Sequence, residues 1–144
     1  MTRYLYITYY FLEINFLRIY KTSNITIQIN AFKYALHGII AFYKKERHAK
    51  IHFCLALTTI ITCIYFKISW QQWVAIIICI AMVFVAEMFN SAIEKTIDFV
   101  CTQKNAELKY IKDVAAAAVL IAAAASTIIA VIILLPKIIY YVTN

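Results

Sequence analysis

Four polar side chains interrupt a long apolar segment near the middle of the sequence, and their types could do chemistry. They are Glu87, Asn90, Glu94 and Asp98, at steps of three, four and four residues. At about 100° per residue of an α-helix they fall within an arc of about 80°, so they share one helix face. Carboxylate and amide oxygens are the ligands that hard divalent cations prefer. We refer to these four residues as the polar stripe.

The apolar segment before Glu87 is long enough to cross a membrane, and the depth of Glu87 within it makes this residue a candidate for function. It lies 14 residues after Trp73, which is about 21 Å along a helix. That places it just inside one boundary of a hydrocarbon layer about 30 Å thick, the cytoplasmic one if the charge distribution described below sets the orientation. An ionisable group there costs about 2–3 kcal/mol or more and marks a functional site by default. The alternative is that Glu87 and Asn90 only hydrogen-bond neighbouring helices and hold an oligomer together.

A short basic loop after the polar stripe favours the functional interpretation. The loop ends in Lys112 and Asp113, and a Lys ammonium can neutralise phosphate charge. Three carboxylates and an amide that face such a loop predict a site for a cation together with a phosphate group.

The composition excludes several classes of protein. Of the residues, 65% are hydrophobic and 15% are charged, against about 25% charged in soluble domains. A single Gly and a single Pro in 144 residues exclude the Gly-rich phosphate loops of P-loop and dinucleotide-binding folds. The formal charge of +7 comes from residues beside apolar runs, which favours a membrane surface and argues against nucleic acid as a partner.

Three apolar stretches predict an all-α integral membrane protein. We expect spans at about residues 53–69, 73–91 and 114–135, with the third ending before Pro136. Alanine runs at 115–118 and 122–125 offer a small-residue surface that other helices can approach closely. The third span is therefore expected at the centre of a helix bundle.

The segment before the first span divides into two parts. Apolar residues at helical spacing predict an amphipathic surface helix over residues 31–52. Residues 1–29 are aromatic and apolar without a clear period, and we expect an N-terminal extension of unknown role there. No cleaved targeting segment is evident. The predicted membrane domain therefore covers residues 30–144.

Lys and Arg are distributed unevenly around the predicted spans. Eight precede the first span, four lie between residues 95 and 112, and two lie elsewhere. The positive-inside rule then predicts a multi-pass protein with its N-terminus in the cytoplasm and its C-terminus outside.

The cysteines and histidines predict no metal site. The four cysteines lack C-x-x-C spacing, and we interpret them as small buried hydrophobes. No second His or Cys shares a helix face with His37 or His52 at a metal-ligand spacing, so we interpret both as packed or solvated imidazoles at the membrane interface.

Longer motifs carry a specific resemblance. The segments AEMFNSAIEKTID and YIKDVAAAAVLIAAA, with NAFKYALHGIIAFYKKERHAKIH upstream, closely resemble the prokaryotic diacylglycerol kinase and undecaprenol kinase family of small trimeric membrane enzymes. The resemblance covers about residues 30–139. It implies a homotrimer in the bacterial inner (plasma) membrane, with active sites between subunits, in which Mg²⁺-ATP donates its γ-phosphate to a lipid alcohol at the cytoplasmic face.

The resemblance also implies roles for individual residues. Glu87 matches the catalytic base, which contacts the lipid substrate and accepts the proton of its hydroxyl. Glu46 and Glu94 match the two carboxylates that bind Mg²⁺ against the nucleotide phosphates. The positions that match the surroundings of the nucleotide are Tyr34, Glu46, Asn90, Glu94, Asp98, Lys112 and Asp113.

Several points stay open. Relatives usually carry a basic residue before the surface helix, where residues 27–30 read IQIN, and Lys21 and Lys33 are the nearest candidates for that nucleotide contact. The segments KKERHAKIH and LPKII resemble the undecaprenol kinase branch of the family more than the diacylglycerol kinase branch. Diacylglycerol stays open as the substrate. The alternatives are a non-enzymatic membrane protein, in which the carboxylates conduct cations or protons or hold an assembly together, and an inactive relative.

Overall fold

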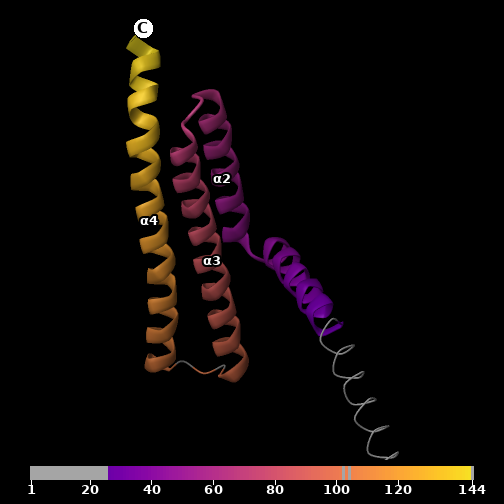
Figure 1. Ribbon diagram of the computed structural model, residues 1–144. Helices are drawn as coiled ribbons and strands as arrows, with labels where there is room; N and C mark the ends of the chain where they lie inside the picture. The colour runs from indigo at the N-terminus through magenta and orange to yellow at the C-terminus, as the bar shows by residue number, and fades with distance from the viewer. Residues whose placement is uncertain (1–25, 102, 104, 144) are drawn as a thin grey trace, which may run out of the picture. The chain divides into compact units, whose positions relative to one another are not determined.

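A computed structural model describes residues 26–101, 103 and 105–143, and these residues are almost entirely helical. The helices are residues 26–45, α2 (Arg47–Tyr65), α3 (Trp70–Val100) and α4 (Ala106–Thr143), as Figure 1 shows. The predicted all-α class is therefore confirmed. The chain divides into two compact units, Met1–Lys44 and Lys45–Asn144.

The helix at residues 26–45 has apolar side chains on its surface, among them Phe32, Leu36 and Ile39. Exposed apolar side chains of this kind suit contact with a lipid surface. The chain leaves helical geometry at Glu46, with φ −95° and ψ 126°, inside the segment 31–52 that we expected to be one helix.

The three remaining helices are long and apolar enough to cross a membrane. The 19 residues of α2 span about 28 Å, close to one hydrocarbon layer. The 31 residues of α3 and the 38 of α4 span about 46 and 57 Å, so both must extend beyond that layer.

The helix α4 continues through Pro136 to Thr143, beyond the expected end of the third span at residue 135. Proline removes one backbone donor and crowds the preceding turn. Membrane helices tolerate it because neighbouring groups and small local adjustments can satisfy the carbonyl that is left without a partner.

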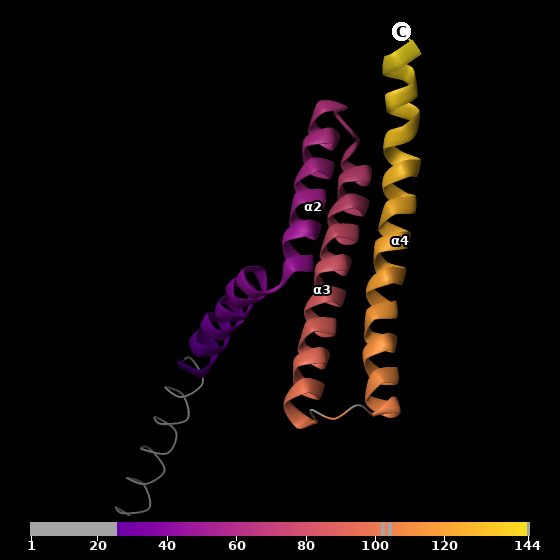
Figure 2. The same cartoon turned by 180° about the vertical axis from the view of Figure 1, so that it is seen from behind.

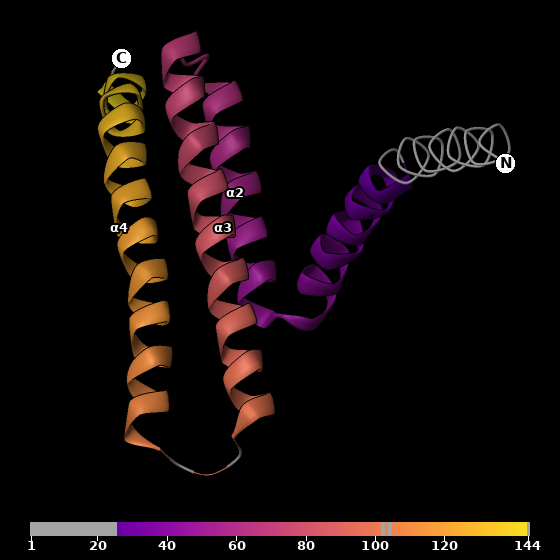
Figure 3. The same ribbon diagram turned by 60° about the horizontal axis from the view of Figure 1, so that its bottom comes forward.

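The helices α2, α3 and α4 lie side by side and alternate in direction, with α3 between the other two (Figures 1 and 2). The turn between α2 and α3 lies at one end of this group, and the loop between α3 and α4 lies at the other end (Figure 3). Asp98, the last residue of the polar stripe, lies in the last turn of α3 and is therefore close to the start of α4.

Residues 66–69 form the tight turn between α2 and α3. Lys67 has a positive φ of 45°, and the Ile68 N–H donates to the Cys63 carbonyl at 3.3 Å. Such bonds satisfy carbonyls at the end of a helix. At the start of α3, Ser69 Oγ accepts from the Gln72 N–H at 3.4 Å, while Gln72 Oε1 accepts from the Ser69 N–H at 2.9 Å. This capping box satisfies two donors that the helix itself leaves free.

A cluster of buried apolar side chains lies near this turn. Its residues come from α2, the turn, α3 and α4, in the order Cys63, Ile68, Ile76 and Ile133. Ile76 is only 1% exposed. Packing drives helix association in lipid, so this cluster holds the three helices together at the end away from the last carboxylates of the polar stripe.

We predict that Ile76→Ala destabilises the folded protein by at least about 2 kcal/mol, because it leaves a cavity in this cluster. The neighbouring Ile77, which is 58% exposed, provides the matched control, and Ile77→Ala should change stability much less. Unfolding in mixed micelles, followed by circular dichroism, measures both. Equal losses for the two variants would contradict the packing described here.

Candidate active site

Glu87 lies inside α3 and is only 5% exposed. Its Oε1 is 3.1 Å from Nε2 of His52, a residue of α2. The two side chains are 7% and 18% exposed. A buried carboxylate needs a hydrogen-bond partner, and His52 supplies one from the adjacent helix.

The bond between His52 and Glu87 was not anticipated from the sequence, because 35 residues separate them. One signal could have pointed to it. Two antiparallel helices joined by the turn at 66–69 bring together residues at equal distances from that turn. His52 is 14 residues before the turn and Val83 is 14 residues after it, and Glu87 lies one helical turn beyond Val83.

Further along the polar stripe, Asn90 Nδ2 donates to Glu94 Oε1 at 3.2 Å. The other amide atom, Asn90 Oδ1, is buried and has no hydrogen-bond partner. An unsatisfied buried acceptor of this kind costs about 1–3 kcal/mol. It therefore calls for an explanation, such as a ligand that approaches it in the working protein.

Glu46, just before α2, forms an ion pair with Lys95 of α3. Lys95 follows Glu94 directly in the sequence. The ion pair therefore brings Glu46 to the part of α3 that carries Glu94, although the two carboxylates are far apart along the chain.

The end of α3 is tied to the start of α4 by an ion pair between Asp98 and Lys112. On α4 itself, Lys109 pairs with Asp113, four residues later. The side chains of Asp98 and Asp113 are 67% and 61% exposed, and that of Lys112 is 32% exposed. Charged groups of both signs thus surround the junction of α3 and α4.

Lys112 and Asp113 lie on a helix, whereas we expected them at the end of a loop. The reason is that α4 begins at Ala106, where the Asn105 side chain caps it. Asn105 Oδ1 accepts from the backbone N–H groups of Glu107 at 2.8 Å and Leu108 at 3.3 Å. Side-chain acceptors at this position satisfy the first free donors of a helix.

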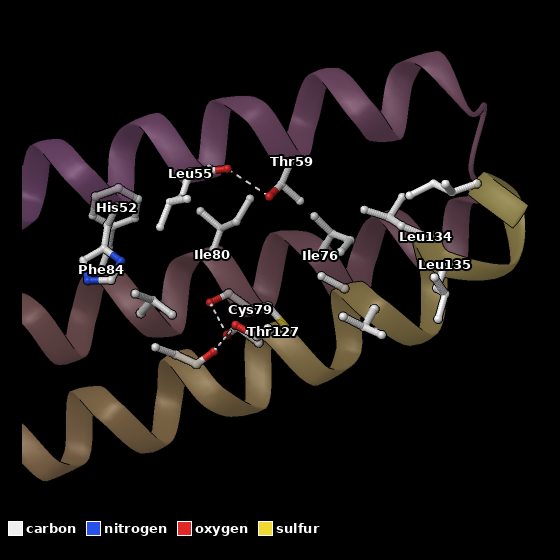
Figure 4. Close-up of a pocket in the computed structure, with 17 residues that line it drawn as sticks. His52, Leu55, Thr59, Ile76, Cys79, Ile80, Phe84, Thr127, Leu134 and Leu135 are labelled. Carbon is white, nitrogen blue, oxygen red and sulfur yellow. Dashed lines mark hydrogen bonds between the residues drawn. The ribbon is translucent and has the colours of Figure 1, made fainter. Parts of the chain in front are cut away.

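Two cavities flank these groups. An apolar one of about 410 Å³ runs between α2, α3 and α4, with His52 and Phe84 at one end and Leu134 and Leu135 at the other (Figure 4). A second, of about 830 Å³, lies at the junction of α3 and α4 and includes Asp98, Lys109 and Lys112 in its lining.

Two predicted site features remain predictions. Tyr34 belongs to the helix at residues 26–45, where it is 69% exposed, and it stays a prediction. Among the residues that the structure describes, no three His, Cys, Asp or Glu side chains converge as a metal site. A cation there would need further oxygen ligands, such as nucleotide phosphates.

Three apolar helices with a buried carboxylate inside and ion pairs at one end define a membrane protein with a polar site at the end of its helix bundle. Residues 33–134 match the prokaryotic diacylglycerol kinase family. That match covers more than half of the chain, so the chain belongs to this family of membrane lipid kinases.

The chain is also similar to two individual lipid kinases. Undecaprenol kinase of Bacillus subtilis strain 168 is 33% identical over 86 residues, which are 60% of this chain and 70% of the relative. Diacylglycerol kinase of Haemophilus influenzae is 29% identical over 87 residues, which are 60% of this chain and 73% of the relative. The protein is accordingly a multi-pass membrane enzyme of the lipid kinase class, and a non-enzymatic role is not supported.

We predict that Asn90→Leu raises the free energy of unfolding by about 1 kcal/mol. The change removes a buried acceptor without a partner, and this gain should exceed the loss of the hydrogen bond from Asn90 to the partly exposed Glu94. The same change should lower kinase activity, as is common where a functional site is built at the expense of stability. Unfolding in mixed micelles and initial rates measure the two effects. The exposed neighbour Phe89 provides the control variant Phe89→Leu. Strong destabilisation by Asn90→Leu would mean that Oδ1 has a structural partner in the assembled enzyme.

Proposed function

We propose that this protein transfers the γ-phosphate of ATP to the hydroxyl of a membrane lipid alcohol, with undecaprenol as the first candidate and diacylglycerol as the second. The observation that carries this proposal is the buried carboxylate of Glu87, held beside an apolar cavity. In support of undecaprenol stand the segments KKERHAKIH and LPKII and the higher identity, 33% against 29%, to the relative named undecaprenol kinase.

Glu87 acts as the general base in this proposal. A base must come within hydrogen-bond reach of the proton that it removes. Val83 and Phe84, one helical turn before Glu87, line the apolar cavity together with His52. A lipid tail in that cavity would bring its hydroxyl to the end where Glu87 lies. As the hydroxyl oxygen bonds to the γ-phosphorus, its proton passes to the Glu87 carboxylate and ADP leaves.

Glu46 and Glu94 would bind Mg²⁺ in this proposal. Glu94 is on α3, and the ion pair with Lys95 brings Glu46, just before α2, to the same part of α3. Mg²⁺ prefers one or two carboxylates completed by phosphate oxygens and water, and the donors present here fit that preference. Asn90 Oδ1, buried without a partner beside Glu94, is a further oxygen that a ligand could use. When bound, Mg²⁺ neutralises charge on the nucleotide phosphates.

The nucleotide would be held at the junction of α3 and α4. Lys112 is suited to neutralise developing phosphate charge, and Asp98 holds its ammonium in place. The cavity of about 830 Å³ beside them leaves room for part of a nucleotide. Asp113 and Tyr34 complete the proposed set of nucleotide contacts. Phosphoryl transfer needs mainly such positioning and electrostatic stabilisation.

We further propose that the site faces the cytoplasm in the bacterial inner membrane and that the enzyme works as a homotrimer. The Lys and Arg between residues 95 and 112 and before the first span support this orientation through the positive-inside rule. Because α3 extends beyond one hydrocarbon thickness, the end that carries Glu94 and Asp98 would reach the water that contains ATP. The trimer is supported by the family resemblance.

We predict that the purified protein in mixed micelles transfers labelled phosphate from Mg²⁺-ATP to a lipid alcohol. Undecaprenol and diacylglycerol are offered in parallel at equal surface fraction, and the faster reaction identifies the preferred substrate. Glu87→Gln should lower kcat about 10²- to 10⁴-fold, because general-base catalysis is lost. Glu107, an exposed residue in the first turn of α4, provides the control variant Glu107→Gln, which should keep its activity.

Full activity of a folded Glu87→Gln variant would contradict the proposed base. Absence of product with both lipids from the folded wild-type protein would contradict both proposed substrates and favour either a third lipid alcohol or an inactive relative.

We predict that Glu94→Gln raises the Mg²⁺ concentration needed for half-maximal rate by at least about tenfold, because a charged ligand is lost from the cation. Initial rates at saturating ATP and increasing free Mg²⁺ measure this, again with Glu107→Gln as the control. An unchanged Mg²⁺ dependence in the Glu94 variant would overturn the metal assignment.

A further inference from the structure

The hydrogen bond between His52 and Glu87 joins α2 and α3 at the end of the apolar cavity where Phe84 lies. Nε2 of His52 lies 3.1 Å from Oε1 of Glu87, and both side chains are mostly buried. Glu87 does not line the cavity, but His52 does. The ring therefore lines one end of the space available to a lipid tail and also contacts the carboxylate that would take the proton.

We propose that His52 is a positioning residue for phosphoryl transfer: it holds the Glu87 carboxylate in the orientation that accepts the proton of the lipid hydroxyl, and it marks where that hydroxyl stops. The inference rests on the proposed role of Glu87 as the base. It adds a residue on a second helix to the reaction centre.

The chemistry of the two groups sets the direction of this bond. An ionised carboxylate can only accept hydrogen bonds, so Nε2 must carry the hydrogen and donate it. A carboxylate has two oxygens and about four lone-pair sites, so one bond from His52 leaves capacity for the lipid hydroxyl. When the hydroxyl proton moves to Glu87, its oxygen bonds to phosphorus, the bond between phosphorus and the ADP oxygen breaks, and His52 keeps its own proton.

The other polar groups around the cavity are engaged within the protein. The hydroxyls of Thr59 and Thr127 each donate to a carbonyl of their own helix, at 2.9 and 2.8 Å, and that of Ser126 donates to the Cys79 carbonyl at 3.3 Å. Their protons therefore point to the backbone. Among the described residues of this lining, His52 is the one that ties the cavity to a carboxylate.

Positioning matters because a small displacement of a catalytic group has a large effect on rate. A shift of about 1 Å in a reacting group can cost about 10²-fold. A Glu side chain has several rotatable bonds, and without a fixed partner it samples orientations that do not face the hydroxyl. The bond from His52 restricts them, and the effect should appear in kcat while the KM for Mg²⁺-ATP stays the same.

The experiment replaces His52 in the full chain in mixed micelles, with the preferred lipid alcohol as acceptor. His52→Phe keeps a planar ring and removes the donor. His52→Gln retains an N–H that can reach the position of Nε2, whereas His52→Asn is too short to reach it. His48, an exposed residue of α2, provides the control variant His48→Phe. Thermal unfolding of every variant establishes that it is folded, and His52→Met replaces His52→Phe if the latter does not fold.

We expect kcat to fall about 10- to 100-fold in His52→Phe and His52→Asn, with the KM for Mg²⁺-ATP unchanged. His52→Gln should recover most of the lost kcat, which a purely space-filling role would not explain. In a Glu87→Gln background, His52→Phe should lower kcat no further, because the group that it orients is absent.

Three results would overturn the inference. They are full activity of folded His52→Phe, equal losses in the Gln and Asn variants, and an additive loss in the Glu87→Gln background. Each leaves the proposed function intact if Glu87→Gln is inactive. Full activity of Glu87→Gln overturns the proposed base itself, and the inference with it, so the two failures are distinguishable.

Discussion

A carboxylate placed inside a membrane helix constrains everything around it. Glu87 is nearly fully buried, and burial of a charged group without a partner is costly in a medium with little water. Its partner, His52, has to come from another helix. The chain must therefore hold α2 and α3 at a fixed register, because a slip of one helical turn would move the ring about 5 Å away from the carboxylate.

The turn at residues 66–69 and the apolar cluster beside it maintain this register. The capping box of Ser69 and Gln72 fixes where α3 begins, and Ile76 packs with Cys63 near the end of α2 and with Ile133 of α4. The apolar packing that holds the three helices together thus lies at one end of the bundle, and polar groups occupy the other end. This separation lets the site contain unsatisfied atoms such as Asn90 Oδ1 while the fold remains held elsewhere.

Helix length connects the buried group to the charged ones. A helix that spanned only the hydrocarbon layer would stop near Asn90, but α3 continues to Val100 and keeps the polar stripe on one face. The capped start of α4 then brings Lys112 to Asp98. One continuous helix therefore carries the polar stripe from the part that can span a hydrocarbon layer to charged residues beyond it. Such a helix suits a lipid kinase, which has to bring a lipid and ATP together.

The sequence alone determined the all-α class, the three apolar helices and the stripe of Glu87, Asn90, Glu94 and Asp98, because these depend on composition and on the local period of a helix. Its motifs also identified the family. Only the tertiary structure decided which groups meet across helices: His52 with Glu87, Glu46 with Lys95, and Lys112 with Asp98. It also decided that α4 begins at Ala106, where Asn105 caps it, so that Lys112 lies on the helix, and that α4 passes through Pro136. Contacts between helices depend on the register and packing of segments far apart in the chain, and the period of a single helix does not determine these.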